Sequence, residues 1–97
     1  MQHIFPSADL SDFRTIAQDS LDLVNAGKSS DATTRIADLE HDWDAAEVRL
    51  KPMNRTKWTE MDGAIDKVLR QLRAVHPDAA GSKSALQTLL GIIESNA

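Results

Sequence analysis

The 97-residue chain has no cysteine and no tyrosine, and aromatic residues make up only 4% of it. Without cysteine there is no disulfide, no thiolate metal site and no cysteine nucleophile. So few aromatic side chains argue against a β-sandwich and against a platform that stacks nucleic-acid bases. Glycine and proline are also scarce, with 4 and 3 residues, which excludes collagen-like and low-complexity chains. The composition therefore favours an all-helical protein.

Long apolar runs and an excess of positive charge are missing too. No uncharged run approaches the ~20 residues of a membrane-spanning helix, so we expect no direct insertion into a membrane. The formal net charge is −4, from 15 acidic and 11 basic side chains, whereas a nucleic-acid-binding domain usually carries a basic excess. We therefore expect no nucleic-acid partner. The charge is uneven, because ten of the acidic residues but only three of the basic ones lie in residues 1–48.

Apolar residues recur at steps of three and four along most of the chain, which is typical of amphipathic helices. The spacing predicts four helices, approximately over residues 8–26, 31–51, 55–76 and 82–95. The second helix has an unbroken apolar stripe, formed by Ala32, Ile36, Leu39, Trp43, Ala46 and Leu50. The third has another, formed by Trp58, Met61, Ile65, Val68, Leu72 and Val75. Gly27, Pro52 and Pro77 separate the helices, because glycine ends helices readily and proline disfavours the helical conformation in the residue before it.

Short connections predict that consecutive helices are antiparallel neighbours, so the expected fold is all-α, an antiparallel up-down-up-down four-helix bundle. We expect residues 1–97 to form a single helical-bundle domain. Its predicted core consists of Leu10, Phe13, Ala17, Ile36, Leu39, Trp43, Leu50, Trp58, Met61, Ile65, Val68, Leu72, Leu86 and Leu89. Further apolar residues lie beside these stripes, namely Ile16, Leu23, Leu69, Leu90 and Ile92. They indicate either a wider core or an apolar surface that forms a homodimer.

Acidic residues are concentrated on the second predicted helix. Glu40, Asp44 and Glu47 recur at steps of four and three and so share one face. In a hairpin that turns around Pro52, Asp62 of the third helix would lie close to Glu47. Carboxylate oxygens are the ligands that hard cations such as Ca²⁺ or iron ions prefer, so Glu40, Asp44, Glu47 and Asp62 are the candidate metal ligands. The alternative is an ordinary solvated acidic face.

Basic residues gather around Pro52, where Arg49, Lys51, Arg55 and Lys57 follow one another closely. Such a cluster can dock a phosphate group or an acidic partner, so these four residues are the candidate partner-binding site. The alternative is a local electrostatic role, because cations are favoured at a helix C-terminus, where Arg49 and Lys51 lie. The pattern does not identify the partner.

Catalytic motifs are missing from the sequence. It has no G-x-S-x-G, no phosphate-binding P-loop, no dinucleotide-binding fingerprint and no His-Glu-x-x-His. The histidines, His3, His41 and His76, do not share a helix face, and the Glu-x-x-His motif of di-iron bundles is lacking. We therefore expect no enzymatic activity and no cofactor. The expected function is that of a non-enzymatic domain that acts through contacts with an unknown protein.

A wider pattern runs through the helix end Leu23–Lys28, the acidic stretch Trp43–Glu47 and the segment from Trp58 to Arg73, which contains Asp62-x-x-Ile65-Asp66. Over residues 12–74 it resembles small helical domains of bacterial envelope proteins and, more distantly, the extracytoplasmic helical domain of bacterial iron permeases. The resemblance implies an accessory module whose Glu40, Asp44 and Glu47 bind a metal cation weakly. It also favours the periplasm over the cytoplasm if the chain is a trimmed piece. This chain departs from the pattern because no second glutamate-rich motif follows on the third or fourth helix.

Overall fold

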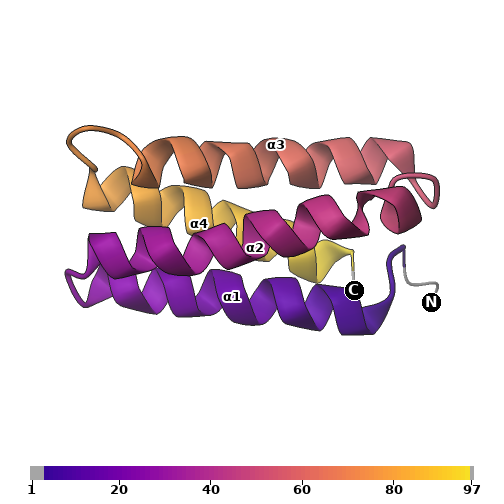
Figure 1. Ribbon diagram of the computed structural model, residues 1–97, viewed down its shortest axis with the longest axis horizontal. Coiled ribbons are helices and arrows are strands. Elements are labelled where there is room, and N and C mark those ends of the chain that lie inside the picture. The colour runs from indigo at the N-terminus through magenta and orange to yellow at the C-terminus, as the bar shows by residue number, and fades with distance from the viewer. Residues whose placement is uncertain (1–3, 97) are drawn as a thin grey trace.

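The computed structural model describes residues 4–96, which form four α-helices and, within that range, no β-strand. The helices are α1 (Ser7–Asn25), α2 (Ser29–Leu50), α3 (Arg55–Leu72) and α4 (Ala79–Ser95). They lie side by side along the long axis of a molecule that measures 38 × 22 × 18 Å (Figure 1). The prediction of an all-α chain with four helices is confirmed. His3 lies outside the described residues.

The turn between α1 and α2 depends on Gly27. Its φ of 75° lies in the left-handed region that glycine adopts without strain. In this conformation the N–H groups of Gly27 and Lys28 donate to the carbonyls of Val24 and Leu23, at 3.0 and 2.8 Å. These bonds satisfy carbonyl groups that the end of a helix leaves without an intrahelical partner. Gly27 therefore ends α1 as the sequence predicts.

The connection between α3 and α4 is longer than predicted and lies earlier in the sequence. α3 ends at Leu72 rather than near residue 76, and α4 begins at Ala79 rather than near residue 82. Pro77 disfavours the helical conformation in the residue before it, so α3 ends upstream of the proline. The carboxylate of Asp78 accepts hydrogen bonds from two backbone N–H groups in the first turn of α4 and so caps the earlier start. Val75, which was expected on the apolar stripe, is consequently 90% exposed.

The predicted core residues are all buried. The core also takes in Phe5, which precedes α1, together with Ile16 and Leu69. Partly buried against it are Leu23, Leu90 and Ile92. Ile16 and Leu69 thus belong to a wider core, whereas the homodimer stays a prediction. The large apolar side chains that stand exposed in residues 4–96 are Val48, Met53 and Val75.

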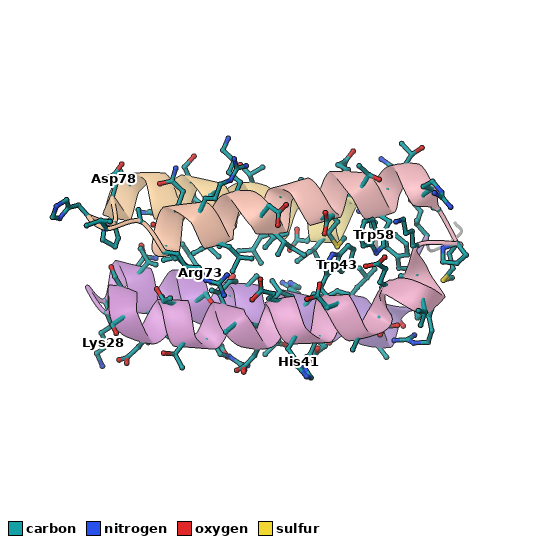
Figure 2. All side chains as sticks on the ribbon, turned by 45° about the horizontal axis from the view of Figure 1, so that its top comes forward. Lys28, His41, Trp43, Trp58, Arg73 and Asp78 are labelled. Carbon is teal, nitrogen blue, oxygen red and sulfur yellow. The ribbon has the colours of Figure 1, made fainter. Side chains whose placement is uncertain are left out.

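Stacked tryptophan rings join α2 to α3. Figure 2 shows Trp43 and Trp58 between the two ribbons, and their ring centroids are 5.2 Å apart with an angle of 18° between the ring planes. Phe13 of α1 meets Trp43 edge-on at a centroid distance of 5.5 Å. Each such aromatic pair contributes about 0.5–1.5 kcal/mol beyond its buried area. The cluster fixes α2 against α3 and so positions the turn that joins them.

Candidate functional site

The turn between α2 and α3 forms one end of the molecule (Figure 1), and we call residues 48–57 the basic tip. It contains all four candidate partner-binding residues and no acidic residue. Val48 in the last turn of α2 is 81% exposed, and Met53 in the turn itself is 53% exposed. The sequence held a signal for both, because Val48 lies off the apolar stripe of α2 and Met53 lies outside the helices. The basic tip therefore combines positive charge with exposed apolar side chains.

Neighbouring carboxylates surround the cations of the basic tip. Arg49 forms an ion pair with Asp9 of α1 at 2.9 Å. Two others pair along their own segment of chain, Lys51 with Glu47 at 3.7 Å and Lys57 with Glu60 at 3.8 Å. Solvent-accessible pairs of this kind contribute roughly 0–1 kcal/mol each, so they can exchange partners at little cost.

Two details single out Lys51 and Arg55 within the basic tip. The ammonium of Lys51 also lies over the ring of Trp58, 4.8 Å from its centroid, which links the basic tip to the aromatic cluster. Arg55 is exposed and forms no ion pair with any residue that the structure describes. Its guanidinium group therefore has all of its donors available to a ligand.

Three of the four candidate metal ligands, Glu40, Glu47 and Asp62, take part in other contacts. Glu40 binds the guanidinium of Arg73 with both oxygens, at 2.8 and 3.3 Å, and this hydrogen-bonded pair lowers the pKa of Glu40. Glu47 pairs with Lys51, and Asp44 is exposed. In residues 4–96, no three His, Cys, Asp or Glu side chains form a group that could hold a metal ion.

Asp62, the fourth candidate ligand, faces Trp43. The indole Nε1–H of Trp43 donates to its carboxylate at 2.9 Å. The sequence predicts Asp62 near Glu47 and gives no sign of this donor, since helical periodicity indicates which face a residue occupies but not which side chain lies opposite. The pairing of Arg73 with Glu40 was not predicted either. The two residues are 33 positions apart in the sequence, and spacing within one helix does not show which side chain of another helix lies opposite.

The interface between α1 and α2 carries two ion pairs that link the helices. Arg35 of α2 donates to Asp19 of α1 at 3.0 Å and to Asp38 of its own helix at 2.9 Å. Within the basic tip, Arg49 of α2 binds both oxygens of Asp9, at 2.9 and 3.2 Å. Two arginines of α2 thus hold two aspartates of α1 along the edge of this interface.

The carboxyl groups of Asp12 on α1 and Asp42 on α2 perturb each other's pKa across the same interface. Side-chain hydrogen bonding with Asp42, together with desolvation and the charge of Asp42, raises the pKa of Asp12 to about 6. The same interaction lowers the pKa of Asp42, and His41 beside it acts in the same direction. Sequence reasoning did not single out either residue.

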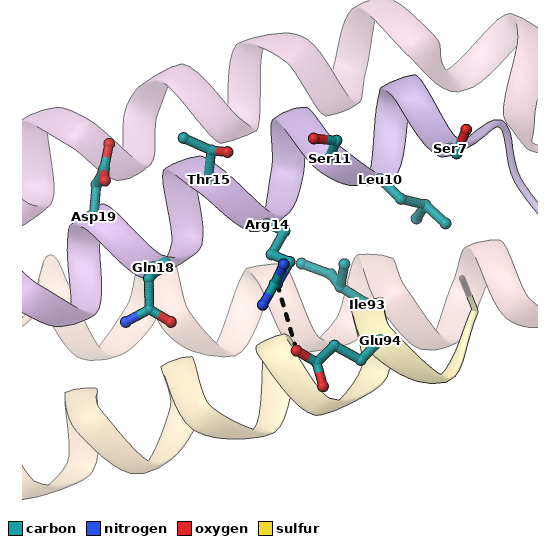
Figure 3. Close-up of a pocket in the computed structure, with 9 residues that line it drawn as sticks. All are labelled: Ser7, Leu10, Ser11, Arg14, Thr15, Gln18, Asp19, Ile93 and Glu94. Atoms are coloured by element: carbon teal, nitrogen blue, oxygen red, sulfur yellow. Dashed lines mark ion pairs between the residues drawn. The ribbon is translucent and has the colours of Figure 1, made fainter.

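A groove of about 610 Å³ lies between α1 and α4 (Figure 3). Within its lining, Arg14 forms an ion pair with Glu94 at 3.4 Å, and both side chains are 62% exposed. The second carboxylate of the lining, Asp19, is bound to Arg35. Hydroxyl groups reach the groove from Ser7, Ser11 and Thr15. Among the residues that the structure describes, no histidine, lysine or cysteine lines it.

Comparison with known proteins finds no relative of the chain: no family model matches it, and neither a curated protein nor a solved structure does. The resemblance to envelope domains and iron-permease domains therefore stays a prediction. Within residues 4–96, no helix combines the length and apolar character needed to cross a membrane. The function must be inferred from the side chains themselves.

Proposed function

We propose that the chain is a non-enzymatic helical-bundle domain that acts through protein contacts, and that the basic tip is its contact surface. The observation that carries the proposal is the combination of exposed Val48 and Met53 with four basic residues in a stretch without acidic ones. Exposed apolar side chains among polar ones are typical of protein interaction sites. Methionine suits such a surface because its flexible side chain adapts to the shape of a partner.

The charge of the basic tip favours a partner with an acidic surface. Arg55 has no competing ion pair among the described residues, so an incoming carboxylate can bind it without displacing another. The intramolecular pairs of Lys51 and Lys57 are partly exposed and weak, so a partner's carboxylates can replace Glu47 and Glu60. Electrostatic attraction of this kind mainly raises the association rate and falls as salt is added.

We also infer that the four helices form an antiparallel up-down-up-down bundle. The connections are short, over residues 26–28, 51–54 and 73–78, and short connections favour antiparallel neighbours. Each helix packs on the next, and α4 packs back on α1. This topology places the α2–α3 turn alone at its end of the bundle, away from the other two turns, where a partner can reach it.

Site-specific photo-crosslinking tests the proposed function. A photoreactive amino acid would be placed at position 53, and at exposed position 87 of α4 as the matched control, in cells that produce the chain naturally. We expect a discrete higher-mass adduct from position 53 that is missing from position 87 and is lost in Arg55→Glu/Lys57→Glu. Adducts of equal intensity at both positions, or an adduct that survives the charge reversal, would contradict the role of the basic tip.

A further inference from the structure

A second groove, of about 610 Å³, lies between α2 and α3, and we call it the α2–α3 groove. Glu40 lines it from α2, and Asp66, Leu69, Arg70 and Arg73 line it from α3 and the residue that follows α3. The last four are spaced by three, one and three residues and so share one helix face. Figure 2 places Arg73 toward the end of the molecule opposite the stacked tryptophans. The groove thus combines two acidic and two basic side chains with one apolar residue.

One ion pair neutralises half of these charges. Both oxygens of Glu40 accept hydrogen bonds from Arg73, at 2.8 and 3.3 Å. The two bonds come from the two terminal nitrogens of Arg73, and each of these nitrogens carries a second N–H. Because Glu40 holds the guanidinium in place, these outer N–H groups are already ordered before a ligand arrives.

The other two charged residues of the groove have no such partner. Asp66 and Arg70 are exposed, and neither forms an ion pair with any residue that the structure describes. They lie one helical turn apart, where opposite charges attract, but exposed pairs of this kind are weak and a ligand can compete with them. The α2–α3 groove therefore presents one uncompensated charge of each sign.

This balance of charge selects the class of ligand. A lone anion that approaches Arg70 also meets the carboxylate of Asp66, and a lone cation that approaches Asp66 meets the guanidinium of Arg70. A ligand that carries an ammonium group and a carboxylate side by side meets each of them with the opposite charge. A free α-amino acid carries both groups on one carbon atom, whereas a peptide separates them at its two ends.

The apolar residue of the groove lies between the two uncompensated charges. Leu69 follows Asp66 by three residues and precedes Arg70 by one, and its side chain belongs to the core and is 6% exposed. Its exposed edge therefore forms an apolar floor beside the charged groups. An apolar side chain of the ligand can rest there while the charged groups of the ligand face the charged residues.

We propose that the α2–α3 groove binds a free α-amino acid with an apolar side chain. Arg70 and the outer N–H groups of Arg73 bind its carboxylate, Asp66 binds its ammonium group, and Leu69 contacts its side chain. All of these contacts are accessible to solvent, so the binding is reversible and has a Kd on the order of 1 mM. The site shares no residue with the basic tip, so the failure of one proposal leaves the other standing.

The groove between α1 and α4 provides a comparison within the same molecule. It has about the same volume, 610 Å³, and is also lined by an arginine and two carboxylates. Arg14 pairs there with Glu94. The second carboxylate, Asp19, pairs with Arg35. Since both of its carboxylates are already paired, we expect this groove not to bind the amino acid.

Backbone amide chemical shifts of the purified chain, measured by NMR as L-leucine is added, test the site. We expect saturable shifts centred on residues 66–73 at millimolar concentrations of L-leucine. Two analogues each lack one charge: isocaproate has no ammonium group, and isoamylamine has no carboxylate. Each should bind at least about fivefold more weakly than L-leucine, because each loses one charged contact.

Substitutions in the groove test the same contacts from the side of the protein. Arg70→Gln and Asp66→Asn should each weaken the binding of L-leucine at least about fivefold. Both side chains are exposed, so we expect both variants to fold, and the dispersion of their amide spectra checks this. Arg14→Gln in the groove between α1 and α4 is the matched control and should bind as the unmodified chain does. If either variant does not fold, the comparison of the two analogues decides.

The other outcomes each overturn the proposal. One is the lack of any saturable shift in residues 66–73 at millimolar L-leucine. Equal binding of isocaproate would show a simple anion site, and equal binding of isoamylamine would show a simple cation site. Shifts of the same size around Arg14, or shifts that persist in both Arg70→Gln and Asp66→Asn, would show non-specific contact with the surface.

Discussion

The interface between α2 and α3 has an aromatic half and a charged half. In the aromatic half, Trp43 and Trp58 stack at 5.2 Å and are 1% and 8% exposed. In the charged half, Glu40 and Arg73 meet at 2.8 Å with side chains that are 38% and 45% exposed. Figure 2 shows the tryptophans toward the basic tip and Arg73 toward the opposite end. The same two helices are therefore joined by burial in one half and by a solvated ion pair in the other.

This difference indicates where the stability of the interface resides. Burying a large aromatic ring removes apolar area from water and creates many close contacts. An exposed ion pair gains little, because water screens the charges and ordering the two long side chains costs entropy. The aromatic half should therefore supply most of the free energy that holds α2 against α3. The charged half should mainly determine which polar groups face each other.

Removing the ring of Trp43 should produce the largest effect. We expect Trp43→Ala to lower the free energy of unfolding by ~3–5 kcal/mol, because it leaves a cavity in contact with both Trp58 and Phe13. Chemical denaturation of the purified variant measures this. Val48→Ala, which changes an exposed apolar side chain of the same helix, should cost less than ~0.5 kcal/mol. A loss below ~1 kcal/mol for Trp43→Ala would show that the aromatic half does not dominate.

The indole N–H groups of the two tryptophans should contribute different amounts to the free energy of unfolding. Trp43 Nε1–H donates to the carboxylate of Asp62, whereas the buried Nε1 of Trp58 finds no acceptor among residues 4–96. Replacement by phenylalanine keeps a ring and removes the N–H. We expect Trp43→Phe to cost about 1–2 kcal/mol more than Trp58→Phe, because only the first loses a hydrogen bond to a charged group. Equal losses in urea titrations of the two variants would show that the bond to Asp62 contributes nothing.

Sequence periodicity predicted the aromatic half far better than the charged half. The steps of three and four placed Trp43 and Trp58 in the core because burial depends on the helix face, and a face can be read from spacing alone. Which donor meets Glu40 or Asp62 depends on the rotation and axial offset of a second helix, which spacing within one helix does not contain. The early end of α3 was missed as well. The apolar pattern runs on to Val75, whereas Pro77 disfavours a helical residue before it and Asp78 already caps the start of α4.

The ion pair of the charged half should contribute little. We expect Glu40→Gln to lower the free energy of unfolding by about 0–1 kcal/mol, and less at high salt. Arg73→Gln should behave alike, and the double variant should lose no more than either single one. Because Arg73 lowers the pKa of Glu40 from 4.5, the contribution is present above that pH and is lost as pH falls below it. A salt-independent loss above ~2 kcal/mol would place this pair among the contacts that hold the interface.

Cation binding should have the smallest effect, since three of the four candidate metal ligands already have donors. Glu40 is bound to Arg73, Glu47 to Lys51 and Asp62 to Trp43. A cation would have to displace these donors and would still find few oxygens, whereas Ca²⁺ takes about six to eight. We therefore expect millimolar Ca²⁺ or Mg²⁺ to leave the thermal midpoint within about 2 °C of the metal-free value. A larger rise that disappears in Glu40→Gln/Glu47→Gln, but persists in Asp22→Asn on α1, would show instead that these helices open their ion pairs to bind a metal.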